Sequence, residues 1–267
     1  EVDDSTPAYH VYGGTQDNNS LGGPSRTLNR PGITNGDWFV TWGGDGFHSR
    51  VEPGNPDIVY ATLQHGVLAG FDRKSGEAIL IQPQQGPGEP PLRWNWDSPL
   101  LVSPFSPTRL YFASNRLYRS DDRGKTWRKV SESNAFMERE AGTYGWVFGQ
   151  IRVDPNDENT VYTMGLSLHV SRDGGKTFSR IRTHGGDHHA LWIDPANSLY
   201  LLNGFDQGLN VSYDGGKSWR YFQDLLPVCQ FFNLNYDMDA PFRVYGSMQD
   251  HGSFRAKVDL SRGRDKI

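Results

Sequence analysis

The stretch Ser120–Trp127, with the sequence SDDRGKTW, decides the fold because it recurs along the chain. Close copies lie at Ser171–Phe178 (SRDGGKTF), 51 residues further on, and at Ser212–Trp219 (SYDGGKSW), 41 residues after that. A degenerate copy, FDRKSGE, begins at Phe71. Three copies that keep the Ser, the central Asp, the Gly, the Lys and the closing aromatic ring indicate a structural repeat and not a coincidental turn.

Each copy has the chemistry of a hairpin turn. We expect the central Asp (Asp122, Asp173 or Asp214) to accept hydrogen bonds from backbone N–H groups two or three residues on, and the following Gly to take a positive φ. The closing Trp or Phe then enters the next strand and faces the core. The repeat therefore predicts an antiparallel hairpin whose turn is held by an acidic side chain.

A second recurring element precedes each hairpin. It consists of an apolar residue, an Asp, Glu or Ser before Pro, a short polar turn, and an apolar residue followed by Tyr. Its Tyr residues are Tyr60, Tyr111, Tyr162 and Tyr200, with looser copies ending at Tyr12 and Tyr245. Each unit then reads as four strands: one before the Pro turn, one with the apolar–Tyr pair, one entering the hairpin turn and one leaving it.

Units of this kind predict an all-β fold, a β-propeller of four-stranded antiparallel blades, with about six units in view. The expected units are 1–44, 45–93, 94–143, 144–185, 186–228 and 229–267, within a single propeller domain or segment over 1–267. The strings VYGGTQDNNS (Val11–Ser20) and VYGSMQDHGS (Val244–Ser253) are two copies of the same strand and turn, so the ends do not complement each other. We therefore expect the array to continue in a longer chain.

Composition excludes several classes of function. The formal net charge is −4 and no block of Lys or Arg occurs, which disfavours a nucleic-acid partner. No apolar run approaches the roughly 20 residues of a membrane span. The single cysteine, Cys229, cannot form an intrachain disulfide or a thiolate metal cluster, and we expect it to be a small core residue.

The hairpin repeats resemble the BNR/Asp-box propellers, which include sialidases, xyloglucan-hydrolysing glycosidases and sortilin-type receptors. A closer resemblance, to the large secreted sortilin-like BNR-repeat proteins of bacteria, covers nearly the whole chain through strings such as VYGGTQDNNSLGGPSR, GGDGFHSRVEP and GGDHHALWIDP. It implies structural Asp boxes and an extracellular or periplasmic location. The Arg-Ile-Pro motif of sialidases is absent, and one cysteine cannot supply the disulfide-rich module of the receptors, so neither activity is expected.

Blade geometry sorts the polar residues. The turn between the second and third strands of a blade lies on the same rim as the links between blades, and the Asp boxes lie on the opposite rim. We expect the first rim to carry the functional site. The candidate catalytic acids there are Asp17, Asp45, Asp187 and Asp250. The candidate substrate-binding residues are Gln16, Trp42, His48, Gln64, His65, Trp96, Asp97, Arg116, Trp146, His188, Asp206 and Gln249.

Carboxylates, imidazoles, amides and aromatic rings around one funnel suit a carbohydrate, because rings stack on sugar C–H surfaces while polar groups bind hydroxyls. Hydrolysis needs two carboxyls roughly 5–10 Å apart. The resemblance to xyloglucan-hydrolysing enzymes places an acid after the apolar–Tyr strand, as at Asp17 and Asp250. Those enzymes hold their two acids in two propellers, so one propeller would contain half a site.

Structural alternatives stand beside these assignments. Asp45 and Asp187 have the surroundings of turn residues that cap backbone amides. The string His184–His189 (HGGDHH) is dense in potential ligands, but adjacent side chains on a strand point to opposite faces unless a bulge intervenes. No cofactor is expected, and the alternative is a divalent ion bound by Asp187 and His188.

Three hypotheses for function follow. The first is a secreted propeller that binds or hydrolyses a polysaccharide, with Asp residues as acid and base. The second is a non-catalytic, sortilin-like propeller that binds a protein or peptide. The third is an architectural segment of a larger secreted assembly.

Overall fold

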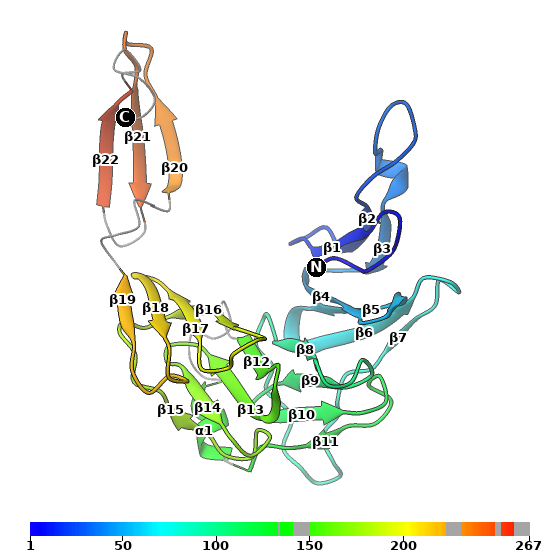
Figure 1. Cartoon of the computed structure of the whole chain (residues 1–267). Helices are drawn as coiled ribbons and strands as arrows, with labels where there is room; N and C mark the ends of the chain where they lie inside the picture. Colours follow the sequence, from blue (N-terminus) through cyan, green and yellow to red (C-terminus); the bar gives the residue numbers. More distant parts are fainter. Residues whose placement is uncertain (133, 141–149, 223–230, 249–251, 259–267) are drawn as a thin grey trace. The chain divides into compact units, whose positions relative to one another are not determined.

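The chain folds into successive antiparallel sheets, as a computed structural model shows (Figure 1). The structure describes residues 1–132, 134–140, 150–222, 231–248 and 252–258. The chain divides into two units, Glu1–Phe222 and Gln223–Ile267. The unit boundaries and the single domain expected from the sequence stay predictions.

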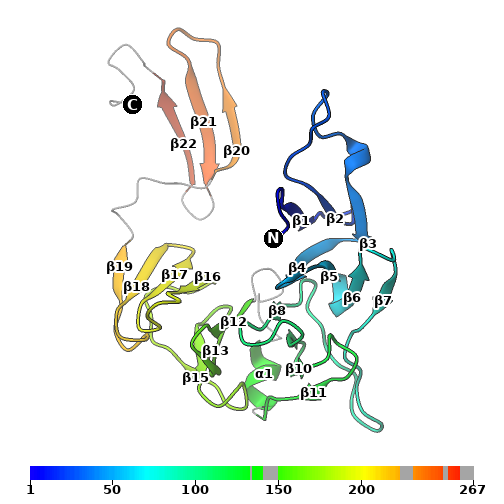
Figure 2. The same ribbon diagram turned by 45° about the vertical axis from the view of Figure 1, so that its right-hand side comes forward.

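Five sheets lie in the described part of the first unit, and strand order within each sheet follows chain order (Figure 2). A short helix, α1 (Asn134–Glu140), follows the third sheet. The strands are β1 (His10–Gly14), β2 (Ser20–Pro24) and β3 (Phe39–Trp42); β4 (Gly46–Glu52), β5 (Asn55–Leu63), β6 (Val67–Asp72) and β7 (Ala78–Leu80); β8 (Leu100–Val102), β9 (Leu110–Ala113), β10 (Leu117–Ser120) and β11 (Arg128–Lys129); β12 (Gln150–Asp154), β13 (Asp157–Met164), β14 (His169–Ser171) and β15 (Ser179–Arg180); and β16 (His188–Ile193), β17 (Leu201–Phe205), β18 (Gly208–Ser212) and β19 (Arg220–Phe222).

The second unit contains one three-stranded antiparallel sheet in its described residues. Its strands are β20 (Phe231–Tyr236), β21 (Arg243–Met248) and β22 (Gly252–Lys257).

The predicted fold class is confirmed. The four complete sheets of the first unit have the four expected strands, and the fold is the all-β, β-propeller type built from four-stranded antiparallel blades. The register corrects one detail. Val59 pairs with Val51 and Val161 with Val153. Tyr60 and Tyr162 are the next residues along their strands and pair with Arg50 and Arg152. In the fifth sheet, Ile193 pairs with Leu201, so Leu202 and not Tyr200 occupies the Tyr position.

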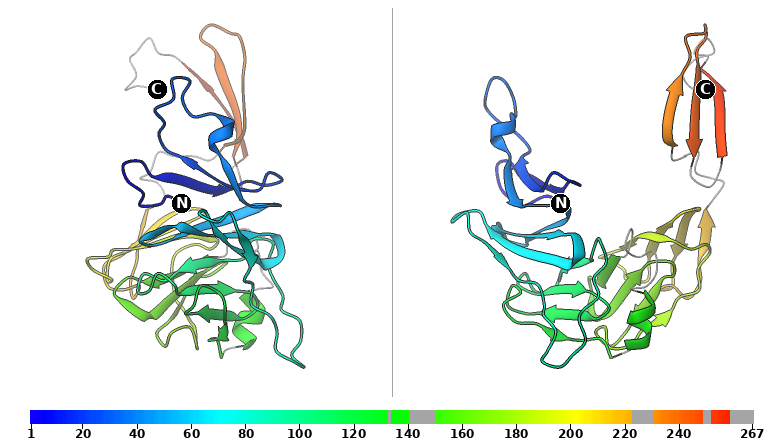
Figure 3. Two further views of the ribbon diagram at one scale, coloured as in Figure 1. Left: turned by 90° about the vertical axis from the view of Figure 1, so that its right-hand side faces the viewer. Right: turned by 180° about the vertical axis from the view of Figure 1, so that it is seen from behind.

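Neighbouring sheets of the first unit follow one another side by side (Figure 3). Apolar side chains pack between them. Tyr111, Leu117 and Val130 of the third sheet meet Ile151 and Val153 of the fourth in one cluster. The ring that closes each Asp box lies in such a cluster, as predicted. Trp127 packs on the preceding sheet and donates from Nε1 to the carbonyl of Ile81 at 2.6 Å. Phe178 and Trp219 occupy the corresponding places in the next two clusters.

The Asp-box turn has the hydrogen bonds that its residues predict. In the first full copy, the Ser120 hydroxyl accepts from the N–H of Gly124 at 2.8 Å and donates to Asp122 Oδ1 at 2.8 Å. The Asp122 carboxylate accepts from the Thr126 hydroxyl and N–H at 2.7 and 2.8 Å, four residues on and so further than expected. These bonds from Thr126 lower the pKa of Asp122 to about 2. The other two copies repeat this pattern.

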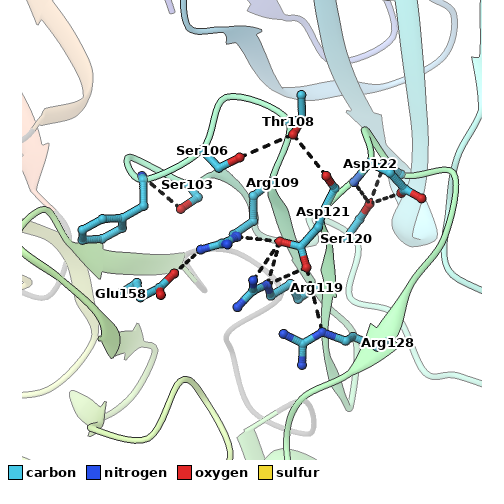
Figure 4. Close-up of polar contacts among 12 residues, drawn as sticks. Ser103, Ser106, Thr108, Arg109, Arg119, Ser120, Asp121, Asp122, Arg128 and Glu158 are labelled. Atoms are coloured by element: carbon cyan, nitrogen blue, oxygen red, sulfur yellow. Dashed lines mark hydrogen bonds and ion pairs between the residues drawn. The ribbon is translucent and has the colours of Figure 1, made fainter.

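A charged network flanks the first box (Figure 4). Asp121 accepts from Arg109 Nε at 2.6 Å and Arg119 Nη2 at 2.8 Å, and Arg128 Nε lies 4.0 Å away. Arg109 also pairs with Glu158, which lies on β13 of the next sheet. The network therefore links two sheets at the Asp-box rim.

A buried carboxylate joins the second and third sheets. Glu52, whose side chain is 2% exposed, accepts from Arg123 Nε and Nη2 at 2.7 and 2.8 Å, and from the Tyr60 hydroxyl at 3.1 Å. Arg123 belongs to the Asp box of the next sheet. The first two sheets use the same device, because Arg73 donates to Asp3 at 3.1 Å while the Tyr12 hydroxyl donates to the same oxygen at 3.2 Å. We call each of these an acid–Tyr–Arg clamp.

Candidate functional site

The links between sheets lie against the turns that join second and third strands, as expected for one rim. The N–H of Gly46 donates to the carbonyl of Thr15 at 3.1 Å, which joins the link before β4 to the β1–β2 turn. The link before β8 meets the β9–β10 turn, where the N–H of Arg93 donates to Asn115 Oδ1 at 3.0 Å. Arg116, half-buried, lies in that same turn and donates its N–H to Ser114.

Asp45 and Asp17 lie together at this rim. The buried Asp45 carboxylate accepts from the backbone N–H of Asp17 at 2.9 Å, and the N–H of Asp45 donates to Gln64 Oε1 at 3.1 Å. Asp17 is exposed and has a φ of 62°, a conformation that a non-glycine residue adopts only when its surroundings hold it. The Asp45 carboxylate stabilises this conformation by capping the N–H of Asp17. That is the structural role that the sequence analysis gave as the alternative to a catalytic one. Gln16 is exposed beside it.

Five of the predicted substrate-binding residues lie in or beside the β5–β6 turn and the link before β8, and two pairs of them are in contact. We call them the Trp96 cluster: Gln64 and His65 from the turn, Trp96 and Asp97 from the link, and His48 from β4. The Trp96 ring is 38% exposed and stands against the His65 ring, edge to face, with centroids 4.9 Å apart. His48 Nε2 lies 3.4 Å from Asp97 Oδ1.

Local packing explains why the cluster forms. Trp94, two residues before Trp96, stacks on Phe112 at 4.9 Å and covers Gly66 at the end of the β5–β6 turn. A Cβ at Gly66 would come within 2.2 Å of the Trp94 ring, and the residue has a φ of 71°, so both space and conformation require glycine. Trp94 thereby fixes the link that presents Trp96 and Asp97.

His48 is neutral at physiological pH, and Asp97 titrates near neutral pH. Burial raises the pKa of Asp97 to about 7, although the charge of Arg50 opposes this. Burial, with the charges of Arg50 and Arg152, lowers the pKa of His48 to about 3. Because His48 is neutral, the two groups do not form an ion pair, although His48 Nε2 and Asp97 Oδ1 are only 3.4 Å apart.

The hydrogen-bond partners assign the tautomer of His48. Arg50 Nη2 lies 3.3 Å from His48 Nδ1, and a guanidinium can only donate, so Nδ1 is the acceptor. The proton of the neutral ring is then on Nε2, which faces Asp97 Oδ1. Neither of these buried atoms has another partner in the described residues.

A second polar cluster lies at the start of the fifth sheet. His189 Nε2 is 2.7 Å from Asp206 Oδ1, and Asp187 lies close enough to Asp206 for the charge of Asp206 to act on it. Burial, followed by the charge of Asp206, raises the pKa of Asp187. A bulge between His188 and Ala190 turns the neighbouring His188 into the interior.

His188 is held within the sheet. Its Nδ1 is 2.7 Å from Asn203 Oδ1 and its Nε2 is 3.3 Å from the Thr183 hydroxyl, so both ring nitrogens have protein partners. Among the residues that the structure describes, no group of three His, Cys, Asp or Glu side chains has the arrangement of a metal site. The divalent ion near Asp187 and His188 stays untested.

Other predicted residues lie apart from these clusters or outside the description. Trp42 is half-buried at the end of β3. Trp146, Gln249 and Asp250, and likewise Cys229, lie outside the described residues. The sequence analysis did not select Arg50 and Arg152, whose charges act on His48. These arginines lie on first strands, directly opposite Tyr60 and Tyr162, so the cross-strand partners of the recurring Tyr residues were the signal that could have identified them.

Comparison with known proteins agrees with this geometry. A family model described as BNR/Asp-box repeat matches residues 118–129, which contain the first full hairpin copy. The chain carries a BNR/Asp-box repeat. No curated protein shows significant similarity to this Asp-box chain.

Solved structures share its fold. The extracellular domain of a hybrid two-component system from B. thetaiotaomicron has a TM-score of 0.54 and 12% identity, over 93% of this chain and 33% of that one. The GH74 enzyme of Niastella koreensis has a TM-score of 0.48 and 16% identity, over 76% of this chain and 34% of that one. The GH74 xyloglucanase of Xanthomonas campestris has a TM-score of 0.41 and 16% identity, over 94% and 46%.

The Asp-box chain therefore spans about a third to a half of the length of these structures. At such identities the likeness shows the fold alone. In the part of the chain that the structure describes, there is no helix with the length and apolar character needed to cross a bilayer.

Proposed function

We propose that the chain is a polysaccharide-binding propeller segment and that the Trp96 cluster is its binding surface. The observation that carries the proposal is that two pairs of residues expected to bind sugar meet across three segments, His65 with Trp96 and His48 with Asp97. Trp96 offers an exposed ring to sugar C–H surfaces, while the Gln64 amide N–H groups and the Asp97 oxygen that does not face His48 offer hydrogen bonds to hydroxyls. An extracellular or periplasmic location belongs to this proposal, since a chain of the same fold is an extracellular domain.

Binding fits the described carboxyls better than hydrolysis does. Asp206 is engaged by His189 at 2.7 Å with Asp187 next to it, whereas glycosidases hold two carboxyls on opposite sides of the bond, roughly 5–10 Å apart. Asp45 uses its carboxylate to cap a backbone N–H. Neither arrangement leaves an acid and a base on opposite sides of a glycosidic bond.

The test is calorimetric titration of the purified chain with soluble polysaccharides, including xyloglucan, mixed-linkage glucan and a polyuronate. We expect binding to at least one, and Trp96→Ala to weaken it about tenfold or more, which corresponds to about 1.4 kcal/mol. Tyr213→Ala is the matched control, because Tyr213 is an exposed aromatic residue of an Asp box and should leave the affinity unchanged.

Two results would overturn the proposal. One is the absence of binding to every polysaccharide by a folded chain. The other is equal affinity in the wild type and Trp96→Ala. Release of reducing ends from the same panel would replace binding with hydrolysis as the function.

A further inference from the structure

Two arginines occupy equivalent places on the first strands of two sheets. Arg50 on β4 pairs across the sheet with Tyr60, and Arg152 on β12 pairs with Tyr162. The first strand between them is β8, which contacts both β4 and β12, and its equivalent residue is Leu101, opposite Tyr111. Two guanidinium groups therefore flank a position that carries an apolar side chain.

The contacts of Arg152 are all with neutral groups. Nη1 donates to the carbonyl of Ile151 at 2.8 Å and Nη2 donates to Gln150 Oε1 at 2.6 Å. In the described residues, Arg152 is half-buried and forms no ion pair. A shielded charge without an ion-pair partner is costly, and this guanidinium has none among the described residues, with the Glu1 carboxylate acting on it only from a distance.

Arg50 has one distant counter-charge. Its Nη1 donates to the carbonyl of Ser49 at 3.0 Å and lies 3.5 Å from Glu1 Oε2, while Nη2 faces His48 at 3.3 Å. The other ionisable group nearby is Asp97, which touches His48. Two permanent cations thus face one loosely placed carboxylate, and neutral His48 adds no charge.

The electrostatics agree that the charges of both guanidiniums act near His48. Burial and then the charge of Arg50 lower the pKa of Arg152, and the charge of Glu1 opposes this. After burial, the charges of both arginines contribute to the low pKa of His48. Both effects place the two guanidiniums within electrostatic range of each other.

We propose that Arg50 and Arg152 form an oxyanion-binding site that takes the carboxylate or sulfate group of an acidic sugar. The planar guanidinium fork matches both groups and binds them with paired hydrogen bonds. His48 lies between this site and Asp97 of the Trp96 cluster, so a charged sugar unit at the arginines would continue towards the proposed binding surface. That the sugar belongs to a polysaccharide rests on the proposed function, whereas the anion site itself does not.

The experiment measures the melting temperature of the chain in low millimolar sodium sulfate, sodium glucuronate or glucose, with sodium chloride keeping the ionic strength constant. We expect sulfate and glucuronate to raise it by about 2–4 °C at saturating concentration, and glucose to have no effect. Arg152→Met and Arg50→Met should abolish the increase. Arg128→Gln, which changes an exposed arginine at the Asp-box rim, is the control and should keep it.

Arg152→Met gives a second readout in anion-free buffer. Because it removes a shielded charge that forms no ion pair, we expect this variant to melt at or above the wild-type temperature. A purely structural Arg152 would instead melt lower on substitution, and that result would overturn the proposal.

The results with sulfate and with glucuronate have separate consequences for the proposal. Stabilisation by anions that persists unchanged in Arg152→Met overturns the site, because sulfate also stabilises proteins non-specifically. Stabilisation by sulfate without glucuronate overturns the assignment to acidic sugars. Stabilisation by glucuronate in a chain that binds no polysaccharide would support the anion site while refuting the proposed function.

Discussion

Removal of Arg123 tests the acid–Tyr–Arg clamp between the second and third sheets. Arg123→Met leaves the Glu52 carboxylate, 2% exposed, without its cation. Breaking a buried ion pair by removing one partner costs about 3–5 kcal/mol. Arg123 itself is 44% exposed, and Glu52 keeps the Tyr60 hydroxyl and the Asn55 amide. We therefore expect a loss of about 2–3 kcal/mol in the free energy of unfolding.

Urea unfolding measures this loss, and a lower melting temperature, by about 4–12 °C, should accompany it. Lys74→Met is the matched control, because Lys74 forms a 2.7 Å ion pair with Asp57 but is 78% exposed. It should cost markedly less than Arg123→Met, because an exposed ion pair contributes little to stability.

The double variant Glu52→Gln/Arg123→Met separates charge from packing. The introduced glutamine side chain is uncharged and can still accept from Tyr60, so the double variant should be more stable than Arg123→Met by about 1 kcal/mol or more. A single variant within about 0.5 kcal/mol of the wild type, or a double variant no more stable than the single one, would refute the reasoning.

Three further predictions concern acids and turns. Folding raises the pKa of Asp97 and lowers the pKa of His48. Between about pH 4 and 6.5 the folded chain therefore holds one proton more on Asp97, and one fewer on His48, than the unfolded chain does. The two contributions to the pH dependence of stability cancel in the wild type. Each single variant exposes one of the two contributions in urea titrations across this range. The stability of His48→Gln should fall as the pH rises towards 7, and that of Asp97→Asn should fall as the pH decreases, each by up to about 1.4 kcal/mol per pH unit. A stability that does not change with pH in either variant would contradict the assigned protonation states. Hydrogen bonds lower the pKa of Asp122 and Asp214 to about 2, so their contribution is complete above about pH 4 and is lost as the pH falls towards 2, which acid unfolding followed by circular dichroism should show. Ser212→Ala leaves the N–H of Gly216 without its acceptor and should cost about 1–3 kcal/mol in urea unfolding, whereas Ser218→Ala, at an exposed hydroxyl, should cost less.

The fold could be predicted because its signals are local. A Ser, an Asp and a Gly within five residues fix a turn by their own hydrogen bonds, and Asp122 shows this directly. Tyr200 shows where local reading fails, since it follows an apolar residue after a Pro turn but lies before the strand that pairs with Ile193. Register depends on cross-strand partners, which a short pattern does not contain.

The rim that carries the candidate residues could be predicted, whereas the contacts between them could not. Gln64, His65 and Trp96 were expected on one rim because blade topology sends turns and links there. The approach of His48 to Asp97 depends on how Trp94 folds the link over Gly66, a packing event between residues nearly thirty positions apart. Arg50 and Arg152 look like ordinary strand residues until the strands are placed side by side.

The position of the Asp-box rings has a consequence for biosynthesis. Trp127 rests on a sheet that precedes it in the chain, and Phe178 and Trp219 do the same one sheet later each time. Each of these three hairpins thus finds its docking surface already made when it leaves the ribosome. A nascent chain can therefore lengthen its ordered part sheet by sheet across these interfaces.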